Sequence, residues 1–299
     1  MLHNADFLSD GARSNAPLLS ICIPTFNRRD PIKRLVADIL TLNAPLEICV
    51  HVDGSTDGTL DALRKIAHQD ERLVLTSGPN RGRAAALRSS ICAATGKFSM
   101  IYDDDDNIYL HCLQDILVVL DRGIAEENVA GFIFSMDLQS DQVAENAFPV
   151  RRSNFIKLRA DENVRGDRKE IVLSSILKPA AMVPAGLSRR VPTSLIWARV
   201  AIDYDVYCMN INVGKKNYLE GGMTANLRRL QRENPYPLLL LHLQHISAFR
   251  RGRYRSPRFL VKSIAGSFIF GSFTLFQLGR NAVRYSFLRL LDTRMIRGR

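Results

Sequence analysis

The sequence lacks the two glycine-rich loops that mark many nucleotide-binding proteins. No G-x-G-x-x-G follows a predicted strand, which excludes the dinucleotide fingerprint, and no G-x-x-x-x-G-K-[ST] is present, which excludes a P-loop. The chain also has neither an internal repeat nor a low-complexity linker. Its first 20 residues show no positively charged segment followed by an apolar run, so we expect no secretory signal.

Cysteine is scarce and irregularly placed. The chain has an odd number of cysteines at widely spaced positions: Cys22, Cys49, Cys92, Cys112 and Cys208. The first two lie inside apolar runs. The pattern is that of neither a disulfide framework nor a zinc site, and it predicts reduced, buried thiols in a cytosolic protein.

The excess of positive charge is confined to the C-terminal end. The net charge is +11, and the segment from Arg250 to Arg299 holds eleven Arg, one Lys and a single acid, Asp292, which together account for all of it. The preceding residues therefore carry no net charge. Such asymmetry indicates that the C-terminal end meets an anionic surface.

The rest of the chain alternates short apolar runs with helical patterns. The apolar runs predict strands at 18–26, 46–53, 72–78, 97–103, 129–138 and 206–214. The periodic patterns predict helices at 30–42, 55–67, 81–96, 109–123, 169–178 and 194–204. This alternation predicts an α/β fold with a parallel sheet built from right-handed βαβ units. We expect one compact body to about residue 235 and then a helical appendage.

Polar motifs stand directly after the first four predicted strands. They are PTFNR (24–28), VDGSTDGT (52–59), GPNRG (78–82) and four consecutive aspartates (103–106). Each of the first three motifs alone is an ordinary turn or capped loop. Ligands of doubly wound sheets collect outside the carboxyl ends of the strands, so together the four motifs predict one binding crevice.

The four aspartates repel one another. Two unit charges about 4 Å apart cost roughly 1 kcal/mol in water and about 4 at an effective dielectric of 20. The run therefore indicates a nearby cation, and the alternative is a solvated acidic turn. In extended chain, Asp103 and Asp105 would point one way while Asp104 and Asp106 point the other.

Four segments in this order and spacing resemble the nucleotide-sugar half of family 2 glycosyltransferases of the GT-A fold. They are SICIPTFNR, VDGSTDGT, PNRGRAAALRSSICAATGKF and MIYDDDD. Downstream, SLIWARVAIDYDVYCMN, KKNYLEGGMT and RENP more weakly resemble the second half of bacterial members that build surface polysaccharides. The resemblance implies a Rossmann-like, mostly parallel sheet flanked by helices. It divides the chain into a nucleotide-sugar half (18–110), an acceptor half (111–235) and a basic amphipathic helical tail (236–299).

The resemblance also implies a donor site with a divalent cation. The implied donor-binding residues are Pro24, Thr25, Asn27, Asp53, Asn80, Gly82, Asp103 and Asp104. The family's D-x-D falls on Asp103 and Asp105, which implies Mn²⁺ or Mg²⁺ held chiefly by Asp105 and shared with the donor diphosphate. A hydrogen bond from the base to Asp53 favours a uracil-type donor. Where many members have Ala-Arg-Asn, this chain has Ala86, Leu87 and Arg88, so its Arg faces elsewhere on the helix.

Inversion at the anomeric carbon needs a carboxylate that takes the proton of the acceptor hydroxyl. Relatives with a similar second half often carry an acid just before the Ser-x-x-Trp helix, where this chain has Thr193. The nearby carboxylates are Asp167 and Glu170, and we predict Glu170 as the base. The alternative is that Glu170 has no catalytic role and lies at a solvated helix N-terminus, where an acidic side chain is favourable. Asp203 and Asp205 are more distant candidates.

The tail predicts contact with a membrane surface. The uncharged stretch from Ser263 to Gly279 has 17 residues, about 26 Å as a helix against a hydrocarbon core of roughly 30 Å. Residues 250–299 therefore suit an interfacial helix on anionic lipid better than a span. The alternative is a basic helix packed on the body. We expect no nucleic acid partner, and we predict that His242 and His245 pack rather than bind metal.

These observations predict a metal-dependent, inverting hexosyltransferase on the inner face of the cell membrane. It would move a sugar from a nucleotide-diphosphate donor, UDP-linked, to a glycan or polyprenyl-linked acceptor. Two alternatives remain open. A nucleotidyltransferase would share the crevice and the acidic site, but it would carry a Gly-rich phosphate loop after the first strand, which PTFNRR lacks. A catalytically impaired membrane-binding module is compatible with Thr193 and the basic tail.

Overall fold

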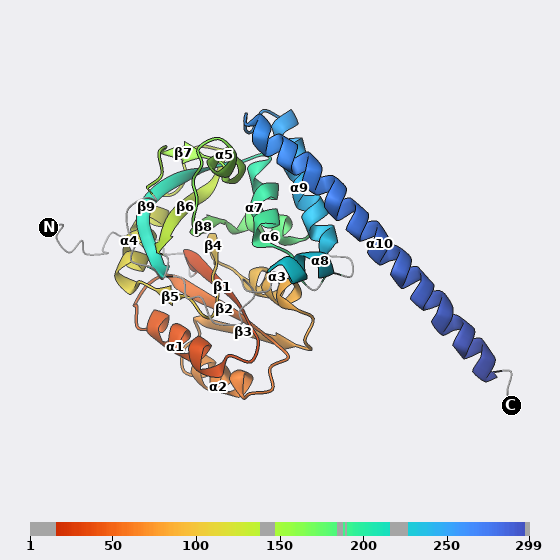
Figure 1. The fold of residues 1–299 in the computed structure, drawn as a ribbon. Helices are drawn as coiled ribbons and strands as arrows, with labels where there is room; N and C mark the ends of the chain where they lie inside the picture. The colour runs from red at the N-terminus through yellow and green to blue at the C-terminus, as the bar shows by residue number, and fades with distance from the viewer. Residues whose placement is uncertain (1–15, 138–146, 184–187, 189, 216–226, 297–299) are drawn as a thin grey trace.

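The structure is a computed structural model, and it describes residues 16–137, 147–183, 188, 190–215 and 227–296. The segment 216–226, which carries part of the resemblance, lies outside the described residues. Figure 1 shows a rounded body of sheet and helices from which one long C-terminal helix projects.

The first half folds as its sequence pattern predicts. Its strands are β1 (Leu19–Thr25), β2 (Leu46–Asp53), β3 (Leu73–Gly78), β4 (Phe98–Ile101) and the short β5 (Asn107–Ile108). The central strands β1, β2 and β4 are buried along their whole length because helices cover both faces of the sheet. The helices are α1 (Arg29–Leu40), α2 (Thr59–Ala67), α3 (Arg83–Ala93) and α4 (Leu110–Asp121).

The second half adds short elements to the same sheet. Its strands are β6 (Val129–Asp137), β7 (Arg152–Ser153), β8 (Arg168–Leu173) and β9 (Asp205–Lys215). Its helices are α5 (Phe155–Ala160), α6 (Ser174–Ala181) and α7 (Thr193–Ala201). Helix α7 packs firmly on the body, because the Trp197 ring lies 5.3 Å from that of Phe155 and is almost fully buried.

The predicted helix over 169–178 is wrong. The segment begins as strand β8 and becomes helix α6 only at Ser174. Strand β8 pairs antiparallel with both β4 and β6, so the backbone groups around Ile171 and Val172 are bonded on both sides. Because that pairing and the complete burial of these two side chains depend on distant strands, they override the local helical pattern.

The strand order is β3-β2-β1-β4-β8-β6-β9-β5, with β7 paired to β9. Strands β1 to β4 are mutually parallel, as are β6 and β9, whereas β8 runs antiparallel between the two groups. This confirms the predicted α/β class with a mostly parallel, helix-flanked sheet. The division of the body at residue 110 stays a prediction.

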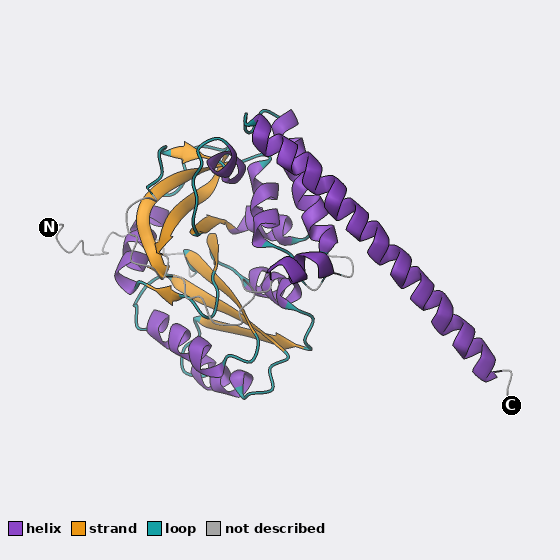
Figure 2. Ribbon diagram, in the orientation of Figure 1, coloured by secondary structure: helices purple, strands orange, loops and turns teal. Residues whose placement is uncertain are grey.

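Two apolar layers cover the sheet. One contains residues of α3, α5, α6 and α7, and the other contains residues of α1, α2 and α4. Figure 2 shows these helices on either side of the strands. With both faces covered, the carboxyl edge of the parallel strands is where loops can gather around a ligand.

The C-terminal appendage is helical, as predicted. It consists of α8 (Leu227–Glu233), α9 (Pro235–Arg250) and α10 (Pro257–Ile296). At 40 residues α10 is about 60 Å long, and it runs along α9 before leaving the body (Figure 1). The Arg253 guanidinium bonds Asp205 and the Tyr204 carbonyl, and Arg251 pairs with Asp203, so two outlying base candidates fasten the turn before α10.

Candidate functional site

The polar motifs after the first three strands lie along one edge of the sheet. In the parallel register Thr25 is level with Val52, and Asp53 is level with Gly78, so β1, β2 and β3 end side by side. Pro24 pairs with His51 just inside this edge. The structure therefore brings the loops after β1, β2 and β3 together, as the crevice prediction requires.

The aspartate run follows β4 at the same edge, but as a turn rather than the extended chain we expected. The amide of Asp106 donates to the carbonyl of Asp103, at 3.3 Å. Burial still alternates: Asp104 and Asp106 are buried, whereas Asp103 and Asp105 keep about a quarter of their side chains exposed. The solvated-turn alternative is thus wrong for the two buried aspartates.

Asp103, Asp104 and Asp105 bind partners from the first and third loops of this edge. The Thr25 hydroxyl donates to Asp104 at 2.7 Å, and Arg28 reaches both Asp104, at 3.3 Å, and Asp105, at 2.6 Å. Arg83 pairs with Asp103. Burial raises the pKa of Asp104 to about 6, although Thr25 and Arg28 oppose the shift. The site therefore holds closely spaced carboxylates whose repulsion is offset by guanidinium groups.

Asp106 pairs with a lysine from the second half of the body. Its carboxylate lies 3.2 Å from Nζ of Lys169, which also stands 4.2 Å from the centre of the Tyr102 ring. Asp106 and Lys169 are both almost completely buried. This pair ties the aspartate turn to β8, so the first and second halves of the body meet at the end of the run.

Asp53 organises the loop after β3. Its two carboxylate oxygens accept hydrogen bonds from the backbone amides of Arg81, at 2.8 Å, and Gly82, at 2.9 Å. Gly82 has a φ of 90°, which only glycine adopts readily. Gly54 packs so closely on the backbone of Asn80 that a Cβ would lie 2.6 Å from its amide nitrogen. The loops after β2 and β3 therefore form one rigid surface.

Asn27 fixes the loop after β1 to the loop after β2. Its side-chain oxygen accepts a hydrogen bond from the backbone amide of Thr56 at 2.8 Å. Its backbone amide donates to the Ser55 hydroxyl at 2.9 Å. A φ of 50° places Asn27 in the left-handed region, which Asn tolerates. Each predicted donor residue thus lies at the end of β1 or β2, in the three joined loops or in the aspartate turn.

The exposed aspartates are chemically suited to a hard divalent cation. Asp103 and Asp105 offer carboxylate oxygens, the ligand type that Mg²⁺ and Mn²⁺ prefer. Each also pairs with a guanidinium group, so a cation would have to displace an arginine. Within the described ranges, no group of three or more His, Cys, Asp or Glu side chains is arranged to hold a metal ion by protein ligands alone. The set therefore fits an ion that takes its remaining ligands from water or a substrate.

The predicted base candidates lie apart from the aspartate run. Glu170 stands on β8, opposite Ile133 of β6. Because neighbouring strand residues face opposite sides, Glu170 points away from the side on which Lys169 meets Asp106. Burial raises the pKa of Glu170 to about 7, although the charge of Lys169 opposes the shift. Asp167 lies in the loop before β8, and Thr193 begins α7.

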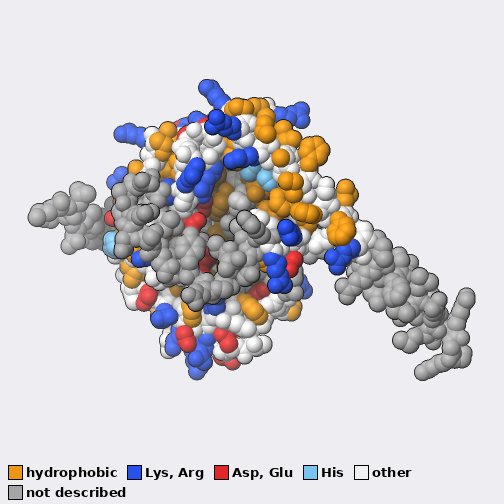
Figure 3. Space-filling view, in the orientation of Figure 1, with side chains coloured by type: hydrophobic (Ala, Val, Ile, Leu, Met, Phe, Trp, Pro, Cys, Tyr) orange, Lys and Arg blue, Asp and Glu red, His pale blue; other side chains and the backbone are white. Residues whose placement is uncertain are grey.

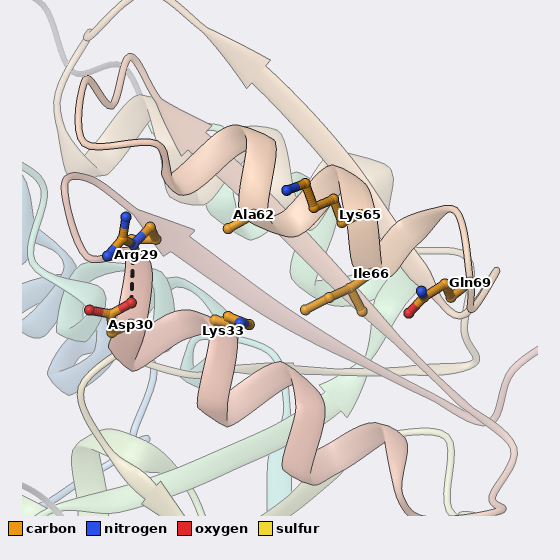
Figure 4. Close-up of a pocket in the computed structure, with 7 residues that line it drawn as sticks. All are labelled: Arg29, Asp30, Lys33, Ala62, Lys65, Ile66 and Gln69. Carbon is orange, nitrogen blue, oxygen red and sulfur yellow. Dashed lines mark hydrogen bonds and ion pairs between the residues drawn. The ribbon is translucent and has the colours of Figure 1, made fainter.

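The surface shows the charged site and a separate pocket. In Figure 3, acidic side chains are visible inside a hollow of the body, with Lys and Arg side chains around it. Figure 4 shows a different pocket, of about 450 Å³, between α1 and α2. It is lined by Arg29, Asp30, Lys33, Ala62, Lys65, Ile66 and Gln69. It includes none of the predicted site residues.

Comparison with known proteins identifies the family that the chain resembles. Residues 20–166 match the family described as "Glycosyl transferase family 2". The hyaluronan synthase of Pasteurella multocida is 34% identical over 117 residues, 37% of this chain and 12% of that protein. The GalNAc(5)-diNAcBac-PP-undecaprenol beta-1,3-glucosyltransferase of Campylobacter jejuni is 28% identical over 112 residues, 36% of each chain.

The solved structures agree on the fold. The crystal structure of S. aureus TarS 1-349 in complex with UDP has a TM-score of 0.55 and 17% identity, and covers 76% of this chain and 65% of that one. Through residues 20–166 the chain belongs to the family 2 glycosyltransferases, with the GT-A fold. It spans only about an eighth of the hyaluronan synthase and a third of the glucosyltransferase.

Sequence reasoning missed three cations at the site. Arg28, Arg83 and Lys169 pair with the aspartates, yet each is between 20 and 77 residues away from its partners in the chain. Arg28 closes the motif PTFNR and Arg83 directly follows GPNRG, so two of them could have been suspected from their places at strand ends. Lys169 carried no such signal, because its segment was predicted to be helical.

Proposed function

We propose that this protein transfers a sugar from a nucleotide-diphosphate donor, UDP-linked, to an acceptor hydroxyl. The observation that carries the proposal is the meeting of three joined loops and the aspartate turn at one sheet edge, within the segment that matches the family. The solved complex of TarS with UDP supports a uridine donor. Asp53 has both oxygens engaged by backbone amides and keeps lone pairs with which to accept from a base.

Asp105 and Asp103 would hold Mn²⁺ or Mg²⁺ in this site. Such an ion, when bound, supplies Lewis-acid stabilisation of the departing nucleoside diphosphate. The chain's own contribution is positional. Asp104 is held by Thr25 and Asp106 by Lys169, which fixes the turn while Asp103 and Asp105 keep about a quarter of their side chains exposed.

Glu170 is our proposed base for inversion, with Asp167 as the neighbouring alternative. A pKa raised to about 7 by burial suits a carboxylate that must accept a proton near neutral pH. Glu170 lies on the strand beside β4, the strand that leads into the aspartate turn, and its backbone neighbour Lys169 touches that turn. Because position 193 is a threonine, it cannot supply the base, so the proposal needs a carboxylate from elsewhere in the chain.

The acceptor side of the proposal includes the tail. Among the described residues, one helical stretch, Pro257–Arg280, is long and apolar enough to cross a membrane by length and composition alone. Its large apolar side chains are exposed, including Phe268 at 73% and Leu275 at 71%. We propose that it lies on the inner face of the cell membrane, where a polyprenyl-linked or glycan acceptor is presented. The name of the Campylobacter relative, which includes an undecaprenol, supports a lipid-linked acceptor.

A panel of nucleotide sugars with Mn²⁺ tests the proposal. A true donor should raise the melting temperature by mass action and be slowly hydrolysed when no acceptor is present. Asp105→Asn should abolish both effects, whereas Asp115→Asn, an exposed acid on α4, should leave them unchanged. Stabilisation without hydrolysis would favour an impaired binding module, and release of pyrophosphate from nucleoside triphosphates would favour a nucleotidyltransferase.

A further inference from the structure

Two arginines pair with the carboxylates that we propose as cation ligands. The Nη1 atom of Arg28 lies 2.6 Å from Asp105 and 3.3 Å from Asp104, and Arg83 pairs with Asp103. Arg28 comes from the start of α1 and Arg83 from the start of α3, so they reach the aspartate turn from two different loops. Their side chains keep 30% and 23% of their surface exposed, which leaves room to turn.

The net charge of the three aspartates and two arginines depends on which ligands are bound. Ionised Asp103, Asp104 and Asp105 with the two guanidinium groups carry one net negative charge. A divalent cation alone would make the group positive while displacing the arginines from their partners. A nucleotide-sugar diphosphate, with two negative charges, would then return the group to its original charge. Cation and diphosphate therefore compensate each other here.

Arg83 has a further reason to need an anion. Burial, and then the charge of Arg83, lower the pKa of Arg190, so the two guanidinium groups are close enough to repel. While Asp103 faces Arg83, that repulsion is partly offset. Once a cation takes Asp103, a phosphate oxygen near Arg83 and Arg190 would replace the lost carboxylate.

We propose that Arg28 and Arg83 are exchangeable counter-ions of the donor site. Without ligand they hold Asp105 and Asp103; when a divalent cation takes those carboxylates, they turn to the donor's diphosphate, whose oxygens suit the guanidinium fork. Cation and nucleotide then bind with positive coupling, and each strengthens the other by the same factor. The inference rests on the proposed donor site and adds the residues that couple its two ligands.

Binding of Mn²⁺ measured by electron paramagnetic resonance, with and without UDP, tests the exchange. In the wild type UDP should tighten Mn²⁺ binding by about tenfold or more, roughly 1.4 kcal/mol per tenfold step. Arg28→Gln should bind Mn²⁺ more tightly than the wild type without UDP, and UDP should then strengthen Mn²⁺ binding by a factor severalfold smaller than in the wild type, because only the direct contact of the diphosphate with the ion and the contribution of Arg83 remain. Arg83→Gln should change both quantities in the same directions.

The matched control is Arg29→Gln, because Arg29 stands next to Arg28 but pairs with Asp30 on the surface. It should behave as the wild type. If Arg28→Gln and Arg83→Gln keep the full UDP effect, or bind Mn²⁺ more weakly without UDP, the counter-ion exchange is wrong although the donor site stands. If wild-type protein binds no UDP at any Mn²⁺ concentration, the donor site itself is wrong and the exchange falls with it.

Discussion

The parallel strands β1 to β4 and the middle strand β8, which we propose to serve the donor and the acceptor, place their charged groups in different ways. On the donor side, charged side chains stand in loops directly after strands, and each meets a partner from another loop of the same edge. On the acceptor side, Lys169 and Glu170 belong to a strand in the middle of the sheet. The difference teaches that short motifs define the donor site, whereas long-range packing defines the acceptor side.

The comparison predicts its largest effect at Asp105. Asp105→Asn removes a carboxylate from the proposed cation site while Asp104 can keep its bonds to Thr25 and Arg28, so the fold should persist. We expect sugar transfer or donor hydrolysis to fall by about a thousandfold or more, because electrostatic stabilisation of the leaving group is lost. Steady-state kinetics with saturating Mn²⁺ would measure it.

Asp115→Asn on α4 controls for the loss of one negative charge. It should change the rate by less than about twofold, because Asp115 is exposed and lies outside the site. An Asp105→Asn enzyme that keeps wild-type turnover would show that the aspartate turn is not the cation site.

The next largest loss of activity is expected at Glu170, on the middle strand β8. Glu170→Gln should lower turnover by about a hundredfold or more, a usual contribution of a general base. Because the base works deprotonated and its pKa is raised to about 7, wild-type activity should rise with pH through about 7 and then level off. That rise should disappear in Glu170→Gln, while UDP binding stays unchanged.

The same group affects stability with a defined sign. Folded protein holds a proton on Glu170 up to a pH of about 7, whereas the unfolded chain releases it near the ordinary value of 4.5. This contribution to stability is therefore complete below about 4.5 and is lost as the pH rises through 7. The melting temperature of Glu170→Gln should fall less over that interval than that of the wild type. Equal slopes would contradict the raised pKa of Glu170.

Asp53 should give a smaller effect on the donor side. In Asp53→Asn one carboxylate oxygen becomes an amide donor, so the backbone amides of Arg81 and Gly82 can no longer both be satisfied. We expect a loss of about 1–3 kcal/mol in unfolding free energy. We also expect UDP binding to weaken by about tenfold. Denaturant unfolding and calorimetry would check both, and an unchanged UDP affinity would remove Asp53 from the donor site.

The tail should give the smallest effect on chemistry and the clearest effect on location. Phe268→Asp places a charge on the exposed apolar side of α10 and should reduce flotation with anionic vesicles severalfold, while activity on a soluble acceptor stays within about twofold. Val118→Asp makes the same kind of change at an exposed apolar residue of α4 and should float as the wild type does. Equal flotation of all three proteins would favour a helix that only packs on the body.

The sequence predicted strands β1 to β4 and the convergence of the loops that follow them for a physical reason. Strands β1 to β4 are continuous apolar runs, and a parallel sheet necessarily brings their carboxyl ends to one edge, so local motifs implied a shared site. Strand β8 was misassigned because its backbone partners are in β4 and β6, which no local pattern reveals. Arg28 was visible in its motif, but its pairing with residues 76 and 77 positions later depends on β1 and β4 lying side by side.

The central claim is that the exposed aspartates after β4 share a divalent ion with a nucleotide diphosphate. A crystal of the protein with UDP and Mn²⁺, measured at the manganese absorption edge, tests it most directly. We predict an anomalous peak within bonding distance of a carboxylate oxygen of Asp105 and of the UDP diphosphate. A manganese peak elsewhere, or ordered UDP at this edge with no ion between it and the aspartates, would contradict the account.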